Sequence, residues 1–151
     1  MTTIGRITIF GAVSGLVWTL VLVVLMPGLI QSSGEAIEVF ACGITSGVIV
    51  SLLLSYPLRR VGSNWSLAFG VGALPLGAFF FGLLRSILQP SSGYVINAGQ
   101  MVEYHDSAIG MGFGMAVLSV FSIFTPLFLP LAILTTYLLR LVMLRSPKAK
   151  E

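Results

Sequence analysis

The chain has 151 residues, of which 56% are hydrophobic and 9% are charged, whereas soluble domains carry about 25% charged residues. This composition excludes an ordinary soluble domain, and the net charge of +3 arises from basic residues beside apolar segments, which does not indicate nucleic-acid binding. Cys42 is the single cysteine, so an intrachain disulfide and a thiolate zinc site are also excluded. We therefore expect residues 1–151 to form one all-α integral membrane domain.

The first predicted membrane span is the apolar run 7–26, which ends at the helix-stopping pair Pro27 and Gly28. The alternative is a cleaved signal peptide, but the apolar core of such a peptide has only about 7 to 15 residues. The loop that follows contains Glu35 and Glu38 and no basic residue. Because cytoplasmic loops are enriched in Lys and Arg, this loop is predicted to lie on the outer side.

The second predicted span, 37–58, ends at Arg59 and Arg60, which return the chain to the cytoplasmic side. Small residues recur at four-residue spacing in both spans, and this spacing places them on one helix face where two backbones can approach closely. We expect the first two helices to form a close hairpin. The candidate packing residues are Gly11, Gly15, Gly43, Gly47, Ser51 and Ser55.

The third predicted span, 65–84, contains Pro75 near its middle, where a kink is expected because proline removes a backbone hydrogen bond. Arg85 follows it and is the one basic residue that this topology places on the outer side. The segment 86–107 is too polar to cross a membrane but contains apolar residues throughout. It is predicted to be an interfacial segment on the outer membrane surface.

The last predicted span, 108–139, has no charged residue and, at about 1.5 Å per residue, is longer than a hydrocarbon layer of about 30 Å. Pro126 and Pro130 predict one long helix that is kinked and extends into the cytoplasm. The expected fold is thus a bundle of four transmembrane helices with both termini cytoplasmic. The expected location is a bacterial-type inner or plasma membrane, which the chain crosses several times.

The ionisable residues of the outer side form a candidate polar cap. Carboxylates and an imidazole suit acid–base chemistry or metal binding, but no known ligand spacing is matched. Three interpretations remain open: a structural cap in which Arg85 pairs with Glu103 or Asp106, recognition of a substrate or ion, and catalysis or metal binding. We assign no catalytic residue, metal ligand or cofactor. The cap residues are Arg85, Glu103, His105, Asp106, Glu35 and Glu38.

A second candidate feature is a polar stripe within the last span. Its hydroxyls either bond to backbone carbonyls near a kink or line a path for a ligand. No span has an ionisable residue near its midplane, which argues against a proton-coupled carrier. The candidate lining or kink residues are Ser119, Ser122, Thr125, Pro126 and Pro130.

Three functions follow from these patterns. The leading hypothesis is a small non-catalytic membrane protein that acts by helix–helix association, as a subunit of a larger membrane complex or as a homo-oligomer. The alternative is a transporter or channel for a small solute or ion, and the third is a membrane enzyme with an extracytoplasmic polar site. The expected partners are the lipid bilayer and other membrane subunits or a second copy of the chain, and no nucleic acid.

Overall fold

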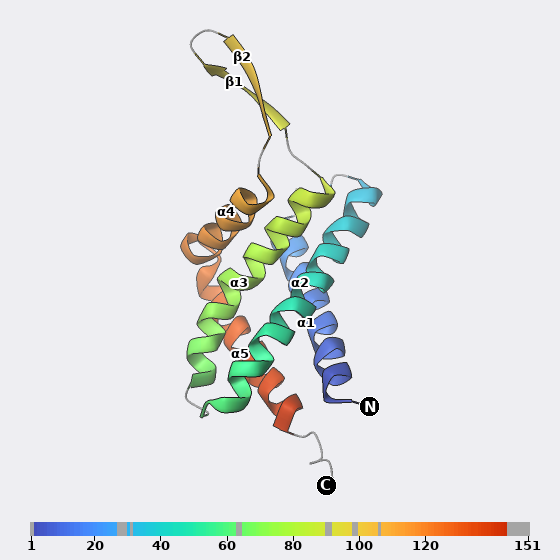
Figure 1. Ribbon diagram of the computed structural model, residues 1–151, viewed down its shortest axis with the longest axis vertical. Coiled ribbons are helices and arrows are strands. Elements are labelled where there is room, and N and C mark those ends of the chain that lie inside the picture. The colour runs from blue at the N-terminus through green and yellow to red at the C-terminus, as the bar shows by residue number, and fades with distance from the viewer. Residues whose placement is uncertain are drawn as a thin grey trace.

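The computed structural model describes residues 2–26, 30, 32–62, 65–89, 92–97, 100–105 and 107–144, with the backbone alone described at residues 66, 92–97 and 100–105. This part of the chain folds into helices and one β-hairpin (Figure 1). In chain order the elements are α1 (Thr3–Leu25), α2 (Ser33–Arg60), α3 (Trp65–Leu88), β1 (Ser92–Asn97), β2 (Gln100–His105), α4 (Ala108–Phe121) and α5 (Thr125–Leu144).

In the part of the chain that the structure describes, four helices are long and apolar enough to cross a membrane, as expected of a multi-pass membrane protein. They are Thr3–Leu25, Ser33–Arg60, Leu67–Leu88 and Thr125–Leu144. Large hydrophobic side chains point outward from all the helices, among them Val24 on α1, Ile37 on α2 and Phe121 on α4. A soluble monomer rarely exposes so much contiguous apolar surface, whereas hydrocarbon solvates it.

Hydroxyl caps explain where three helices begin. The side chains of Thr2, Ser32 and Ser107 accept hydrogen bonds from backbone N–H groups three residues later, at 3.2, 3.3 and 2.9 Å respectively. Such caps satisfy a donor that has no partner inside the helix. Because Ser32 caps α2, this helix begins four residues before the predicted span 37–58 and includes polar residues that hydropathy alone leaves out.

The helices form one bundle in which α1 packs along α2, and α3 packs along α4 and α5 (Figure 1). Near the start of α1 and the end of α5, a buried cluster contains Ile7, Leu58 and Leu139. Toward the opposite end, a second cluster joins Val39 and Phe81. The start of α1 and the end of α5 lie at the same end of the bundle (Figure 1).

The last span differs from the single kinked helix predicted over 108–139. The structure has two helices, α4 and α5, because the helix ends at Phe121 and residues 122–124 are not helical. Pro126 lies in the first turn of α5, where its missing N–H leaves no hydrogen bond unmade. Pro130 lies inside α5, so the interruption comes before both prolines and not at them.

The predicted outer segment 86–107 also has a more regular structure than expected. Helix α3 continues to Leu88, and β1 then pairs with β2 in an antiparallel hairpin in which Ser92 lies opposite His105 and Asn97 opposite Gln100. The hairpin projects beyond the helices (Figure 1). Its β-branched and aromatic residues favour strands, which explains the pairing; its location on a membrane surface remains a prediction.

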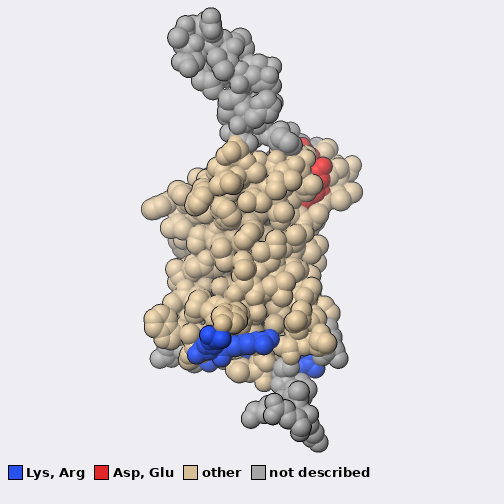
Figure 2. Space-filling model, in the orientation of Figure 1, with Lys and Arg blue, Asp and Glu red and all other residues tan. Residues whose placement is uncertain are grey.

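Charges gather at opposite ends of the bundle. Figure 2 shows Arg side chains at one end and Glu side chains at the other. Arg59 and Arg60 lie in the last turn of α2, whereas Glu35 lies in its first turn, so both sets of charges also complement the helix dipole.

Candidate functional site

A close contact between α1 and α2 forms one wall of the candidate site. A Cβ atom added to Gly11 would lie 2.8 Å from the carbonyl oxygen of Gly47, and one added to Gly47 would lie 2.7 Å from the Cα of Gly15. A Cβ added to Gly43 would overlap the Thr19 side chain. The two backbones therefore leave no room for side chains at these glycines.

The two serines proposed with these glycines differ in their surroundings. Ser51 is buried, and its Oγ would lie 3.0 Å from a Cβ added to Gly11. Ser55 is half-buried and donates its hydroxyl hydrogen to the Leu52 carbonyl at 2.7 Å. The contact therefore includes Ser51, while the described bond of Ser55 stays within its own helix.

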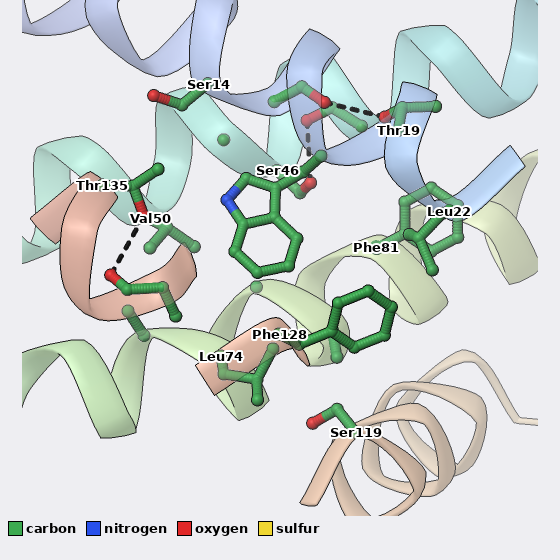
Figure 3. Close-up of a pocket in the computed structure, with 18 of the residues that line it drawn as sticks. Ser14, Thr19, Leu22, Ser46, Val50, Leu74, Phe81, Ser119, Phe128 and Thr135 are labelled. Carbon is green, nitrogen blue, oxygen red and sulfur yellow. Dashed lines mark hydrogen bonds between the residues drawn. The ribbon is translucent and has the colours of Figure 1, made fainter. Parts of the chain in front are cut away.

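A cavity of about 350 Å³ lies beside this contact, within the bundle. All five helices line it, through side chains such as Ser14, Val50, Leu74, Ser119 and Phe128 (Figure 3). The volume falls at the lower end of the range of about 300–1,000 Å³ that ligand sites occupy. This cavity is the candidate functional site.

Hydroxyl groups are common in the lining, but most of them already donate a hydrogen bond to a backbone carbonyl. Thr19 donates to the Gly15 carbonyl at 2.8 Å, and Ser46 donates to the Gly43 carbonyl at 3.0 Å (Figure 3). A hydroxyl in an apolar medium is costly without such a partner. Further lining hydroxyls that bond to carbonyls of their own helix belong to Ser119, Thr135 and Thr136.

The remaining lining is mainly hydrocarbon and aromatic. Trp18 packs against Phe128 with ring centroids 5.6 Å apart, and Phe81 and Leu22 are also lining residues (Figure 3). None of the described residues that line the cavity is ionisable. The cavity is therefore suited to an apolar molecule and poorly suited to a dehydrated ion or a proton relay.

The predicted lining or kink residues fall into two groups. Ser119 and Ser122 line the cavity, whereas Thr125 lies at the helix break. Its Oγ1 lies 2.7 to 3.0 Å from the carbonyl oxygens of Ser119, Val120 and Ser122. Pro126 and Pro130 are not among the described lining residues. Hydroxyls of this stripe therefore both satisfy the backbone at the break and face the cavity.

Sequence reasoning missed most of the lining. Thr19, Ser46 and Thr136 lie on three different helices, so no local spacing connects them. Helical periodicity assigns each one to the inner face of its helix, but it does not say which faces enclose a space. The small residues of the α1–α2 contact were the available signal, because Gly15, Gly43 and Gly47 also line the cavity.

The polar cap is described only in part. Arg85 Nη1 lies 3.2 Å from Glu38 Oε2 and joins the end of α3 to the start of α2, with exposed fractions of 22% and 36% for the two side chains. The expected partners of Arg85 were Glu103 and Asp106; the side chains of Glu103 and His105, and Asp106 as a whole, lie outside the described residues. The carboxylate that the structure places beside Arg85 is thus on α2.

Neither end of the bundle has a described metal site. Within the part of the chain searched, no group of three or more His, Cys, Asp or Glu side chains is arranged to hold a metal ion. Glu35 lies in the first turn of α2 and favours the positive end of the helix dipole. The described cap residues are therefore placed to stabilise the start of α2 and its contact with the end of α3.

Comparison of the chain with protein-family models, curated proteins and solved structures found no match.

Proposed function

We propose that this protein acts non-catalytically within the membrane, by association of its helices with a second copy of the chain or with another subunit of a membrane complex. The observation that carries this proposal is an open glycine face on α4. Gly110 and Gly114 are exposed and four residues apart; a Cβ added to Gly110 would lie 2.8 Å from Oγ of Ser107, the residue that caps α4. Membrane helices use this arrangement for close approach to one another.

Several other glycines of the bundle, among them Gly70 and Gly112, are covered by their own chain. A Cβ added to Gly70 would lie 2.7 Å from the Cα of Ile133, and one added to Gly112 would lie 2.9 Å from the Phe79 carbonyl oxygen. By contrast, a Cβ added to Gly114 would meet no described atom within 4 Å. Because this chain uses glycine repeatedly where helices touch, the open face of α4 supports a contact with another helix.

The neighbours of this glycine face are apolar and aromatic. Phe113, Val117 and Phe121 are all exposed, the last at 82%. They flank Gly110 and Gly114 at three- and four-residue spacing, which places them on the same side of the helix. A partner helix would find a shallow groove at the glycines with aromatic walls, and its packing contacts would replace contacts with lipid.

The charge distribution supports an orientation with both termini in the cytoplasm. One end of the bundle carries four arginines: Arg6 near the start of α1, Arg59 and Arg60 at the end of α2, and Arg140 near the end of α5. Lys and Arg are enriched in the cytoplasmic segments of membrane proteins. We assign the opposite end, with Glu35 and Glu38, to the outer side.

The experiment compares Gly114→Leu with Gly72→Leu. A Cβ at either glycine meets no described atom within 4 Å, and both glycines are exposed, but only Gly114 lies on the proposed contact face. We expect Gly114→Leu to reduce the mass of the assembly purified in mild detergent, while Gly72→Leu leaves it unchanged. An assembly of unchanged mass in the Gly114→Leu variant would contradict the proposal.

A second candidate function, transport, is favoured by the cavity, since Ser119 and Ser122 line it. A path for ions is disfavoured, because the described lining has no charge and Ser119 already donates to the Ala116 carbonyl at 2.7 Å. Vesicles that contain the purified protein are therefore expected to show no ion flux above that of empty vesicles. A flux abolished by Ser119→Ala would favour the channel over association.

A further inference from the structure

We propose that the cavity is a binding site for one acyl chain of a membrane phospholipid. The chain lies along the helix axes, and the phosphate lies toward the end of the bundle that carries Arg6 and Arg140, called here the arginine-bearing end. The site is separate from the α4 face that carries the proposed association. Four observations support it: the length of the cavity, its chemistry, the charges near one end, and the open space at Gly77.

The cavity is elongated along the bundle. On α1 its lining runs from Phe10 to Met26, which is about 24 Å of helix at 1.5 Å per residue, and on α5 it runs from Phe128 to Leu139, about 16 Å. A sphere of 350 Å³ would extend less than half of the longer distance. A narrow space parallel to the helices fits a hydrocarbon chain better than it fits a compact solute.

The lining selects an apolar occupant. Most of its hydroxyls donate to carbonyls of their own helix, as Thr136 does to Ala132 at 2.8 Å, so few partners remain for water. A buried water needs about three hydrogen bonds. An empty apolar cavity loses dispersion contacts along its walls. Acyl chains are the most abundant apolar molecules around a membrane bundle, so they are the occupant that we propose.

Charge fixes the direction of the lipid. At one end of the cavity, the lining residue Leu139 immediately precedes Arg140, and Phe10 lies one helical turn after Arg6. Arginine binds phosphate through charge-assisted hydrogen bonds. At the other end the described charges include Glu35, Glu38 and Arg85, and Arg85 is already paired with Glu38 at 3.2 Å, so the net charge of this end is negative and repels a phosphate. The phosphate of the lipid is therefore placed at the arginine-bearing end.

Two glycines of α3 provide a matched test. Gly77 lines the cavity between the lining residues Leu74 and Phe81, and an added Cβ would meet no described atom within 4 Å. Gly72 is equally open but exposed, and it is not a lining residue. Their separation of five positions corresponds to about 500° of helix rotation, so the two glycines lie on different faces of α3. Leucine at Gly77 fills the cavity, whereas leucine at Gly72 faces the surrounding lipid.

The experiment uses the full chain in vesicles of phosphatidylglycerol with brominated acyl chains, which quench tryptophan on contact. Trp18 lines the cavity and Trp65 is exposed at 61%, so Trp65→Phe isolates the signal of Trp18. We expect Gly77→Leu to reduce the quenching of Trp18 and to remove the phospholipid that stays bound after mild detergent extraction. Gly72→Leu should change neither quantity.

Equal quenching and equal bound phospholipid in the two variants would overturn the proposal. If Gly77→Leu does not give a monodisperse protein, Ser119→Leu fills the cavity from α4, with Val120→Leu, at an exposed residue of α4 that does not line the cavity, as its control. Retention of the phospholipid in Ser119→Leu would then overturn it. Because Gly114→Leu tests association and leaves the cavity open, the two proposals fail independently.

Discussion

Single glycines determine how closely α1 and α2 approach. A Cβ at Gly47 would lie 2.7 Å from the Cα of Gly15 and would also overlap the backbone of Gly11. Both neighbours are backbone atoms, which do not move aside as a flexible side chain does. The contact thus depends on the absence of a side chain, and any larger residue must separate the helices.

We predict that Gly47→Leu destabilises the protein by about 1–3 kcal/mol or more, as overpacking does in other cores. The control is Ala41→Leu, which enlarges an exposed residue of the same helix. Thermal unfolding in detergent should show a lower midpoint for Gly47→Leu alone. Equal midpoints for the two variants would mean that the glycine is not required at this contact.

The ion pair of Arg85 is the second prediction at this scale. Since Arg85 and Glu38 are partly exposed, at 22% and 36%, their coupling is expected to be at most about 1 kcal/mol. A double-mutant cycle with Arg85→Ala and Glu38→Ala measures it through thermal unfolding. Additive effects would exclude the pair, and coupling of Arg85 to Asp106 instead would support the partner predicted from the sequence.

At the scale of elements, the break between α4 and α5 is stabilised by hydroxyl groups. Thr125 Oγ1 lies 2.7 Å from the Ser122 carbonyl, and the Phe124 N–H donates to Ser122 Oγ at 3.1 Å. Backbone groups freed by a helix break are costly inside a membrane unless other groups bond to them. The side chains at the break therefore replace some of the backbone hydrogen bonds that a continuous helix would make.

We predict that Thr125→Val destabilises the protein by about 1–3 kcal/mol, because it leaves a carbonyl at the break without its donor. Thr8→Val is the matched control. Thr8 donates to the Ile4 carbonyl at 3.0 Å, but this oxygen lies within a regular helix whose backbone bonds remain. Thermal unfolding should separate the two variants, and a smaller loss at Thr125 than at Thr8 would contradict this role.

The elements also show how far sequence patterns lead. The length and hydropathy of 7–26, 37–58 and 65–84 were sufficient to predict α1, α2 and α3, because a membrane span depends mainly on composition. The division of 108–139 was missed because Pro126 marks the start of α5, while the interruption itself consists of ordinary residues. The hairpin was missed because its strands are short and their pairing is not a local property.

At the scale of the whole molecule, the candidate cavity could not be predicted from the sequence, because its lining residues come from separate helices. Ser119 and Ser122 were singled out by their spacing, yet Trp18, Val50 and Leu74 line the same space from three other helices. Their common location depends on how the helices pack. The charge asymmetry, by contrast, was readable from the order of the residues, because each charge lies next to a span.

The orientation of the bundle is the last prediction. Arg59 and Arg60 lie at the end of α2, at the opposite end from Glu35 in its first turn, and the beginning of α1 and the end of α5 lie at the same end of the bundle (Figure 1). Because Lys and Arg are retained in the cytoplasm, an alkaline phosphatase fused after Lys150 should be inactive, while one inserted at Ser92 should be active. A second fusion after Lys150 serves as the expression control: a fluorescent protein that folds only in the cytoplasm should be bright at this position.

Phosphatase activity after Lys150 with none at Ser92 would reverse the topology. It would also place the arginine-bearing end of the cavity, and the proposed lipid phosphate, on the outer leaflet.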